Sequence, residues 1–144
     1  LAKEGHTQWN PDLIYFNNRE VKPTTGYYVQ KLYGQNAGNE YLPSKIALDN
    51  KDDKVRKRFA SSIVRDSASG DVIVKLVNLL PVEVNTNVDL SGIGAVQPSA
   101  KRTVLTGKPT DTPLPVEDRI QIAEKFDCNL PAYSFTVIRI QKAN

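Results

Sequence analysis

The stretch Asp71-Val72-Ile73-Val74-Lys75-Leu76-Val77-Asn78 decides the fold class of this chain. Val72, Val74 and Leu76 share one face of a predicted strand. Ile73 and Val77 share the opposite face with Lys75. A period of two with apolar residues on both faces predicts a β-strand in the interior of a sheet.

A turn and a second β-rich run precede this strand. Asp66-Ser67-Ala68-Ser69-Gly70 has the small polar residues and the glycine that favour a tight turn. Residues 59–64 are β-rich, so the two runs predict a hairpin. Further runs, separated by Gly, Pro and Ser clusters, are predicted at 82–90, 102–105, 119–123 and 133–140. Short strands at this spacing are typical of an antiparallel β-sandwich or jelly roll, so the predicted fold class is mainly β.

Residues 1–44 have a different texture and contain most of the aromatic residues. Residues 12–16 form an apolar run stopped by Asn17 and Asn18, which is typical of a strand buried on both faces. A short amphipathic helix is predicted next, because Thr24 or Thr25 can cap it and four residues share one helical face. These four are Tyr28, Val29, Leu32 and Tyr33. We therefore predict a strand–helix unit within 12–35, with the charged stretch 49–54 as a plausible boundary.

Composition excludes several classes of protein. The 144 residues are 40% hydrophobic and 24% charged, which fits a folded domain and not a disordered tail. No apolar run approaches the roughly 20 residues of a membrane-spanning helix, so we predict no membrane partner. The net charge of +3 is small and scattered, which argues against a nucleic-acid partner. The chain begins at Leu1 without a methionine or a signal-like leader, which we interpret as an excerpt from a longer protein.

Residues that usually carry chemistry are sparse. The single histidine, His6, has no second ligand at metal-binding spacing and is interpreted as a solvated side chain. The single cysteine, Cys128, has no disulfide partner and is interpreted as a small buried apolar side chain. The glutamates are spread out, and none lies in an apolar run that would raise its pKa. We therefore predict no catalytic residue, no metal site and no cofactor in this chain.

Two clusters allow both a functional and a structural interpretation. The charged run 51–58 interleaves aspartates with its basic residues, which favours a solvated loop over a nucleic-acid patch. Aromatic residues of the first region could stack on sugars, but the helical spacing of Tyr28 and Tyr33 favours packing. Tyr133 and Phe135 belong to a Val- and Ile-rich run, so we expect both in the core.

Five segments, in order along nearly the whole chain, carry a family resemblance. The first two are Gln8-Trp9-Asn10-Pro11-Asp12-Leu13-Ile14-Tyr15-Phe16-Asn17-Asn18 and Tyr27-Tyr28-Val29-Gln30-Lys31-Leu32-Tyr33. They resemble the last strand of the catalytic barrel, and the helix that closes it, in α-L-arabinofuranosidases of glycoside hydrolase family 51. The others are similar to β-strands of the same family: Ser69-Gly70-Asp71-Val72-Ile73-Val74-Lys75-Leu76-Val77-Asn78, Val104-Leu105-Thr106-Gly107 and Leu130-Pro131-Ala132-Tyr133-Ser134-Phe135-Thr136-Val137.

The resemblance implies a parent enzyme that removes terminal α-L-arabinofuranosyl units from arabinan or arabinoxylan. Such a retaining enzyme uses two glutamates and a covalent glycosyl-enzyme intermediate. Both glutamates would lie upstream of Leu1, so no residue of this chain inherits either role. Residues 1–44 would be the last strand–helix unit of the (β/α)8 barrel, and residues 45–144 the C-terminal jelly roll. The chain would be an accessory domain that stabilises the barrel, is inactive alone, and is secreted or periplasmic.

Barrel geometry adds two expectations. Active sites form at the C-terminal ends of barrel strands, so Asn17 and Asn18 are candidates for the substrate rim of the intact parent. A strand separated from its barrel loses its neighbours, so Leu13, Ile14 and Phe16 would be exposed and available for association, including oligomer formation. The partners implied are the rest of the barrel and, through the parent, an arabinose-containing polysaccharide.

Two alternative functions remain open. A carbohydrate-binding sandwich would range aromatic side chains on one exposed sheet face, whereas a large apolar patch without aromatic residues would favour the accessory domain. The third possibility is an extracellular interaction domain.

Overall fold

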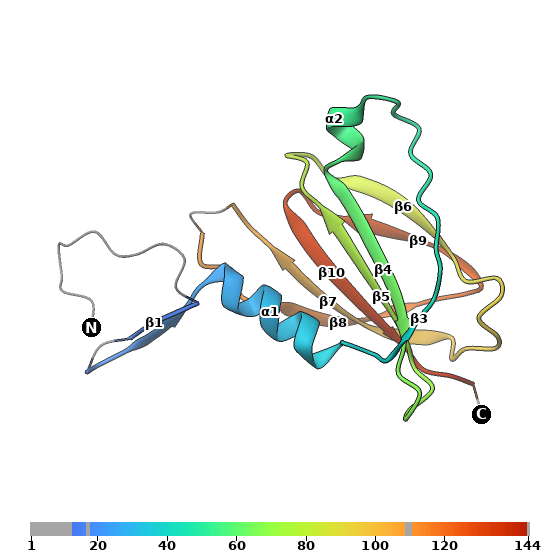
Figure 1. Ribbon diagram of the computed structural model, residues 1–144, viewed down its shortest axis with the longest axis horizontal. Helices are drawn as coiled ribbons and strands as arrows, with labels where there is room; N and C mark the ends of the chain where they lie inside the picture. Colours follow the sequence, from blue (N-terminus) through green and yellow to red (C-terminus); the bar gives the residue numbers. More distant parts are fainter. Residues whose placement is uncertain (1–12, 17, 109–110, 144) are drawn as a thin grey trace.

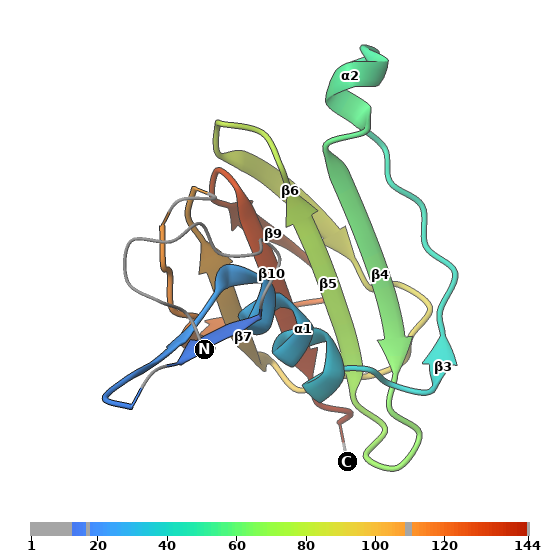
Figure 2. The ribbon, with the colours of Figure 1, turned by 60° about the vertical axis from the view of Figure 1, so that its left-hand side comes forward.

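The computed structural model describes residues 13–16, 18–108 and 111–143, and within them the chain forms ten strands and two helices. Figures 1 and 2 show a β-sandwich, with helix α1 lying along one face of the larger sheet. Strands β1 and β2 extend away from the sandwich beyond the start of α1 (Figure 1). The described residues include no helix that is long and apolar enough to cross a membrane. The predicted class, a mainly β antiparallel sandwich preceded by a strand–helix segment, is confirmed.

Strands β1 (Ile14–Phe16) and β2 (Val21–Pro23) form an antiparallel pair. The predicted strand is therefore present, but its predicted burial on both faces is wrong for this chain. One short partner strand covers little of it, and Leu13, Ile14 and Phe16 are exposed. Exposure of these three side chains is what we expect of a strand separated from a barrel.

Helix α1 (Thr25–Gln35) begins where the sequence predicts a cap. The Thr24 hydroxyl accepts a hydrogen bond from the Tyr27 backbone N–H at 3.4 Å, which satisfies one of the unpaired donors of the first turn. At the other end, the Asn36 side chain donates to the Leu32 carbonyl at 2.9 Å. Leu32 is buried against the sheet, with Tyr28 and Val29 packed beside it. The amphipathic helix is confirmed.

The larger sheet, called the main sheet below, holds the described strands β3, β4, β5, β10, β7 and β8 in that spatial order. All neighbouring pairs are antiparallel. The bounds are Glu40–Tyr41 for β3, Phe59–Arg65 for β4, Val72–Asn78 for β5, Ser99–Thr106 for β7, Val116–Gln121 for β8 and Ser134–Ile140 for β10. The C-terminal strand β10 thus lies between β5 and β7.

A smaller sheet of the described strands β6 (Val84–Asp89) and β9 (Lys125–Leu130) packs on one face of the main sheet. The predicted runs at 59–64, 71–78, 82–90, 102–105 and 133–140 correspond to β4, β5, β6, β7 and β10. Two expectations are corrected. Strand β8 begins at Val116, before the predicted run at 119, and β9 was not predicted although its residues alternate between buried apolar and exposed polar side chains.

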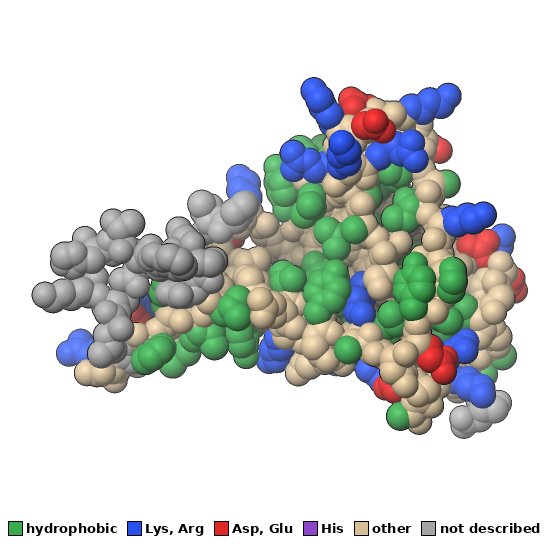
Figure 3. Space-filling model, viewed as in Figure 1, with side chains coloured by type: hydrophobic (Ala, Val, Ile, Leu, Met, Phe, Trp, Pro, Cys, Tyr) green, Lys and Arg blue, Asp and Glu red, His purple; other side chains and the backbone are tan. Residues whose placement is uncertain are grey.

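The charged run 51–58 contains the short helix α2 (Asp53–Arg56). The Asp52 carboxylate accepts a hydrogen bond from the Lys54 backbone N–H at 2.8 Å and so caps the helix. Basic side chains gather around α2 at the top of the molecule (Figure 3). The run is a solvated connection into β4, as predicted, but with one helical turn in it.

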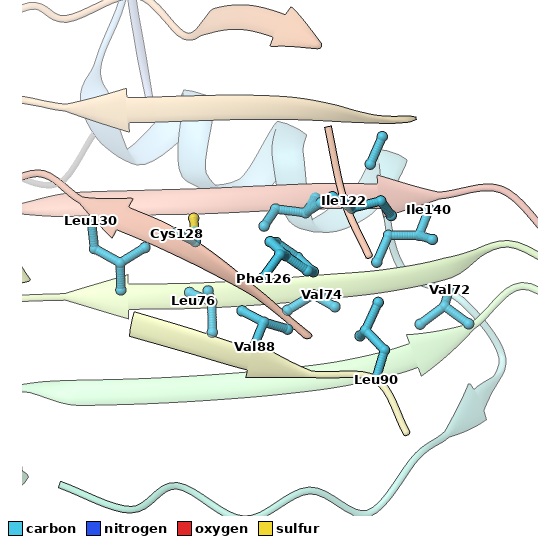
Figure 4. Close-up of a cluster of buried hydrophobic side chains, with 12 residues drawn as sticks. Val72, Val74, Leu76, Val88, Leu90, Ile122, Phe126, Cys128, Leu130 and Ile140 are labelled. Carbon is cyan, nitrogen blue, oxygen red and sulfur yellow. The ribbon is translucent and has the colours of Figure 1, made fainter. Parts of the chain in front are cut away.

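Side chains of both sheets meet in the main core (Figure 4). Val74 and Leu76 of β5 lie against Phe126 and Cys128 of β9. Cys128 is 2% exposed, so its interpretation as a small buried apolar residue is confirmed. Each fully buried aliphatic or aromatic side chain of this kind contributes about 1.5–3 kcal/mol relative to its exposed state.

A second cluster fills the space between the main sheet and α1. It consists of the buried residues Leu32, Ile73, Leu105, Phe135 and Val137, with Tyr28, Val29, Val64 and Val77 packed against them. Strand β5 therefore buries alternate side chains in two different clusters, as its period predicts. The face of the main sheet that carries this cluster is called the α1 face below.

Asn78, the last residue of β5, ties two other segments to the sheet. The side chain is fully buried, and its Nδ2 donates to the Val82 and Pro131 carbonyls at 2.9 Å each. The Leu130 carbonyl lies 3.2 Å from the same nitrogen. The Asn78 Oδ1 accepts from the Leu80 backbone N–H at 3.0 Å. One amide thus satisfies polar groups of the 79–82 connection and of the end of β9.

Candidate interaction surface beside helix α1

Asn18, one of the two candidate rim residues, lies in the exposed connection between β1 and β2. Asn17, together with Trp9 and His6, lies outside the described residues. Four carboxylates in the described part of the chain have a shifted pKa. Each accepts hydrogen bonds from a basic side chain, a backbone N–H or a hydroxyl group. The hydrogen bond from the Ala68 backbone is the main reason that the pKa of Asp66 lies below its ordinary value. Hydrogen bonds from Lys125, Lys101 and Arg102 lower the pKa of Asp89, Glu117 and Asp118 in the same way.

A general acid needs the opposite environment, one that raises the pKa of its carboxyl. These four carboxylates are therefore suited to structural ion pairs and not to proton donation. Within residues 13–16, 18–108 and 111–143 no group of three His, Cys, Asp or Glu side chains is placed to hold a metal ion.

The β1–β2 pair is the first part of an apolar surface. Phe16 is 60% exposed and Val21 65% exposed, and Leu13 and Ile14 are exposed beside them. The pair extends from the sandwich at the start of α1 (Figure 1). Contiguous exposed apolar side chains on a soluble protein mark contact sites for other protein surfaces.

The α1 face of the main sheet carries the second part. The Tyr33 ring of α1 stacks on Phe135 of β10, with centroids 4.7 Å apart and planes 13° from parallel. Tyr33 nevertheless stays exposed, because Phe135 covers only one side of its ring. Tyr41 of β3 pairs with Val64 of β4, so it lies on the same face, and it is 68% exposed. Figure 3 shows hydrophobic side chains gathered on this side of the molecule.

Lys75 lies among these apolar residues. Its position between Ile73 and Val77 along β5 places it on the α1 face, and it is only 3% exposed. Its Nζ lies 5.5 Å from the centroid of the Tyr33 ring, a cation–π distance. Burial lowers the pKa of the Lys75 ammonium from its ordinary value.

Two other basic side chains of the α1 face form ion pairs. Arg139 Nε lies 2.6 Å from Asp71 Oδ2, and Arg139 Nη2 lies 3.0 Å from Asp66 Oδ2. Lys101 Nζ lies 2.9 Å from Glu117 Oε1. Among the described residues, no carboxylate lies within 4.0 Å of Lys75 Nζ.

The packing expectations for the aromatic residues are partly corrected. Phe135 is 5% exposed and lies in the core, as predicted. Tyr133 is exposed, contrary to the prediction, because its backbone has a positive φ of 49° and leaves the strand geometry just before β10. Tyr28 is half-buried in the α1 cluster, as expected, while Tyr33 combines packing with exposure.

A groove with a volume of about 690 Å³ lies between the 45–50 segment, the start of β4 and strand β6. Phe59 is the aromatic residue of its described lining, and it is half-buried. Sugar-binding surfaces of β-sandwiches rely on exposed aromatic rings. The groove therefore does not favour the carbohydrate-binding alternative, and the exposed aromatic side chains Tyr33 and Tyr41 lie instead on the α1 face.

Comparisons with known proteins agree with the fold. A family model described as the α-L-arabinofuranosidase C-terminal domain matches residues 6–136. "Alpha-L-arabinofuranosidase 1" of Arabidopsis thaliana is 28% identical over 94% of this chain, and "Extracellular exo-alpha-L-arabinofuranosidase" of Streptomyces chartreusis is 49% identical over 31% of it. The matches span 21% and 6% of the lengths of these two relatives, so the chain corresponds to a small part of either.

Solved structures give the same result. The arabinose-bound MgGH51 α-L-arabinofuranosidase superposes with a TM-score of 0.82 and 28% identity, over 95% of this chain and 22% of the solved chain. The GH51 α-L-arabinofuranosidase of Thermotoga petrophila superposes with a TM-score of 0.72 and 13% identity, over 89% of this chain and 31% of the solved one, which supports the fold. The family match over most of the chain is decisive: the protein belongs to the α-L-arabinofuranosidase C-terminal domain family.

Proposed function

We propose that this chain is the accessory C-terminal part of a family 51 α-L-arabinofuranosidase, inactive alone, and that it packs against the catalytic barrel and stabilises it. The observation that carries the proposal is the apolar surface formed by the β1–β2 pair and the α1 face. Phe16, Val21 and Tyr41 are each at least 60% exposed, which is unfavourable for a domain that has no partner.

The proposed partner is the rest of the parent chain. Residues 1–44 would complete the barrel with its last strand and helix, and residues 45–144 would form the sandwich domain. In a barrel, β1 would pair with barrel strands on either side, so its apolar side chains would be buried from both faces. Association of two copies through Leu13, Ile14 and Phe16 is the competing use of the same surface.

Hydrolysis would then belong to the parent and not to this chain. The two carboxylates of a retaining glycosidase would come from barrel strands upstream of Leu1, and the substrate would be an arabinose-containing polysaccharide such as arabinan or arabinoxylan. Asn18, and Asn17 beside it, would lie at the rim of that site, because they follow the C-terminal end of the strand. Secretion is proposed on the basis of the extracellular Streptomyces relative.

A chromogenic α-L-arabinofuranoside tests the proposal directly. The 144-residue chain and a chain extended upstream through the barrel are compared at equal concentration. We expect turnover only from the longer protein. Turnover by the shorter chain would refute the accessory function and require a carboxylate pair within these residues.

The rim residues are tested in the longer protein. Asn18→Ala is expected to raise KM for an arabinan oligosaccharide, with Asn39→Ala, in the connection between α1 and β3, as the control. An unchanged KM would remove Asn18 from the substrate rim.

A further inference from the structure

Lys75 is a buried basic side chain without a counterion among the described residues. Its neighbours across the sheet are Ser62 on β4 and Val137 on β10, neither of which carries charge. The ammonium group has three N–H donors, and the contact with the Tyr33 ring can use at most one of them. The ammonium group keeps only a small contact with water, and a charge that has lost most of its hydration is stabilised when an opposite charge reaches it.

The acidic residues of the same face are not available to it. Glu117 is held by Lys101, and Asp71 is held by Arg139 through a 2.6 Å contact. Lys75 is thus the buried cation of this face with no carboxylate within 4.0 Å among the described residues, whereas Arg119, opposite Lys101, has no ion pair either but is exposed to water. The missing carboxylate must therefore come from outside the described residues, or be absent.

The position of Lys75 favours the first case. Its Nζ lies beside the ring of Tyr33, a residue that is 42% exposed at the surface that we assign to docking. A side chain that entered beside this ring would meet an ammonium group in an apolar surround, where a charge-assisted hydrogen bond is strong. The charge of the site is positive, so the complementary group is an anion.

We propose that Lys75 receives an aspartate or glutamate from the catalytic barrel, inserted beside Tyr33 when the barrel docks on the α1 face. The inference rests on the proposed function and adds the chemistry of the contact: an apolar surface with one acidic side chain at its centre. Lys75 is then the residue that sets the register of docking, because an ion pair in an apolar interface tolerates little displacement.

The test uses the full-length enzyme and its thermal unfolding midpoint. Lys75→Met keeps the aliphatic stem and removes the charge. If a barrel carboxylate pairs with Lys75, the substitution leaves that carboxylate buried and unpaired, and the midpoint falls by about 4 °C or more. If no carboxylate is present, removal of an uncompensated buried charge leaves the midpoint unchanged or raises it, and the proposal is overturned.

Lys101→Met is the matched control, because Lys101 is on the same face but half exposed and already paired with Glu117. Its expected shift is no more than about 2 °C. Lys75→Arg keeps a positive charge and should lose less than Lys75→Gln. If Lys75→Met yields no soluble enzyme, the comparison of Lys75→Arg with Lys75→Gln is the test. Equal decreases in the unfolding midpoint for these two variants would overturn the proposal.

Tyr41→Gln separates this proposal from the docking on which it rests. Tyr41 is highly exposed on the α1 face, so a neutral polar replacement matters only if another surface covers it. A lower unfolding midpoint for Tyr41→Gln with an unchanged midpoint for Lys75→Met would refute the carboxylate contact and support docking of the barrel on the α1 face. No loss for either variant would refute both.

Discussion

Replacement of Asn78 gives the sharpest test of how the sandwich is held together. Asn78→Ala removes two donated hydrogen bonds at 2.9 Å and one accepted bond at 3.0 Å from a fully buried site. A typical hydrogen bond contributes about 1 kcal/mol net, and buried groups left without a partner add to the loss. The expected decrease in the free energy of unfolding is therefore about 3–4 kcal/mol.

Asn78→Asp distinguishes hydrogen bonding from volume. The substitution keeps the size of the side chain but replaces the amide nitrogen by an oxygen that faces the carbonyls of Val82, Leu130 and Pro131. Four oxygen atoms would then crowd one buried site without a donor, so the aspartate should destabilise more than the alanine.

The assay is equilibrium urea unfolding followed by circular dichroism. With a slope of about 2 kcal/mol per molar urea, the expected loss for Asn78→Ala lowers the urea midpoint by roughly 1.5–2 M. Asn85→Ala, at an exposed position on β6, is the control and should stay within about 0.5 kcal/mol of the unmodified chain. A loss below about 1 kcal/mol for Asn78→Ala, or a milder effect for Asn78→Asp, would refute the reasoning.

Three further outcomes are expected from the same unfolding assay and from thiol chemistry. Gly38→Ala should destabilise the chain by at least about 1 kcal/mol, because φ at Gly38 is +64° and an added Cβ would lie 2.6 Å from the Val64 side chain. Gly34→Ala should stabilise it by about 0.5–1 kcal/mol, because Gly34 lies within α1 and its Cβ would enter open space. Arg102 holds the pKa of Asp118 below its ordinary value, so the ionised Asp118 stabilises the folded chain. This stabilisation is full above the unfolded pKa of about 3.9 and disappears as pH falls through the folded pKa. The urea midpoint should therefore fall from pH 5 to pH 3, and it should fall less steeply in Arg102→Gln. Burial raises the pKa of the Cys128 thiol, so a disulfide reagent should modify it only as the chain unfolds, and rapid modification of the native chain would contradict its placement in the core.

Local patterns account for most of the secondary structure that was predicted. The alternation in β5, the turn at 66–70 and the Thr24 cap are each determined by residues within a few positions of one another. Strand β9 also alternates, with Phe126, Cys128 and Leu130 buried, so the local signal of a half-buried strand was present there and was missed.

The interaction surface was less accessible to sequence analysis. Lys75 is visible as a polar residue in an apolar strand, but its lack of a counterion depends on α1 and on which carboxylates the neighbouring strands use. Tyr41 becomes significant only when β3 pairs with β4. Tyr133 was expected in the core because strand alternation was extended one residue too far, into a backbone of positive φ. Each of these features arises from contacts between distant segments, on which local propensity has no bearing.

The central place of β10 has a consequence for biosynthesis. It is the last of the described strands to leave the ribosome, and it pairs with β5 and β7, which precede it by about sixty and thirty residues. Until it arrives, β5 and β7 each present an open edge in the nascent chain, and contacts of such long sequence separation form slowly. A premature stop before Ser134 would therefore remove the strand that joins β5 to β7 and leave two open sheet edges that are prone to aggregation.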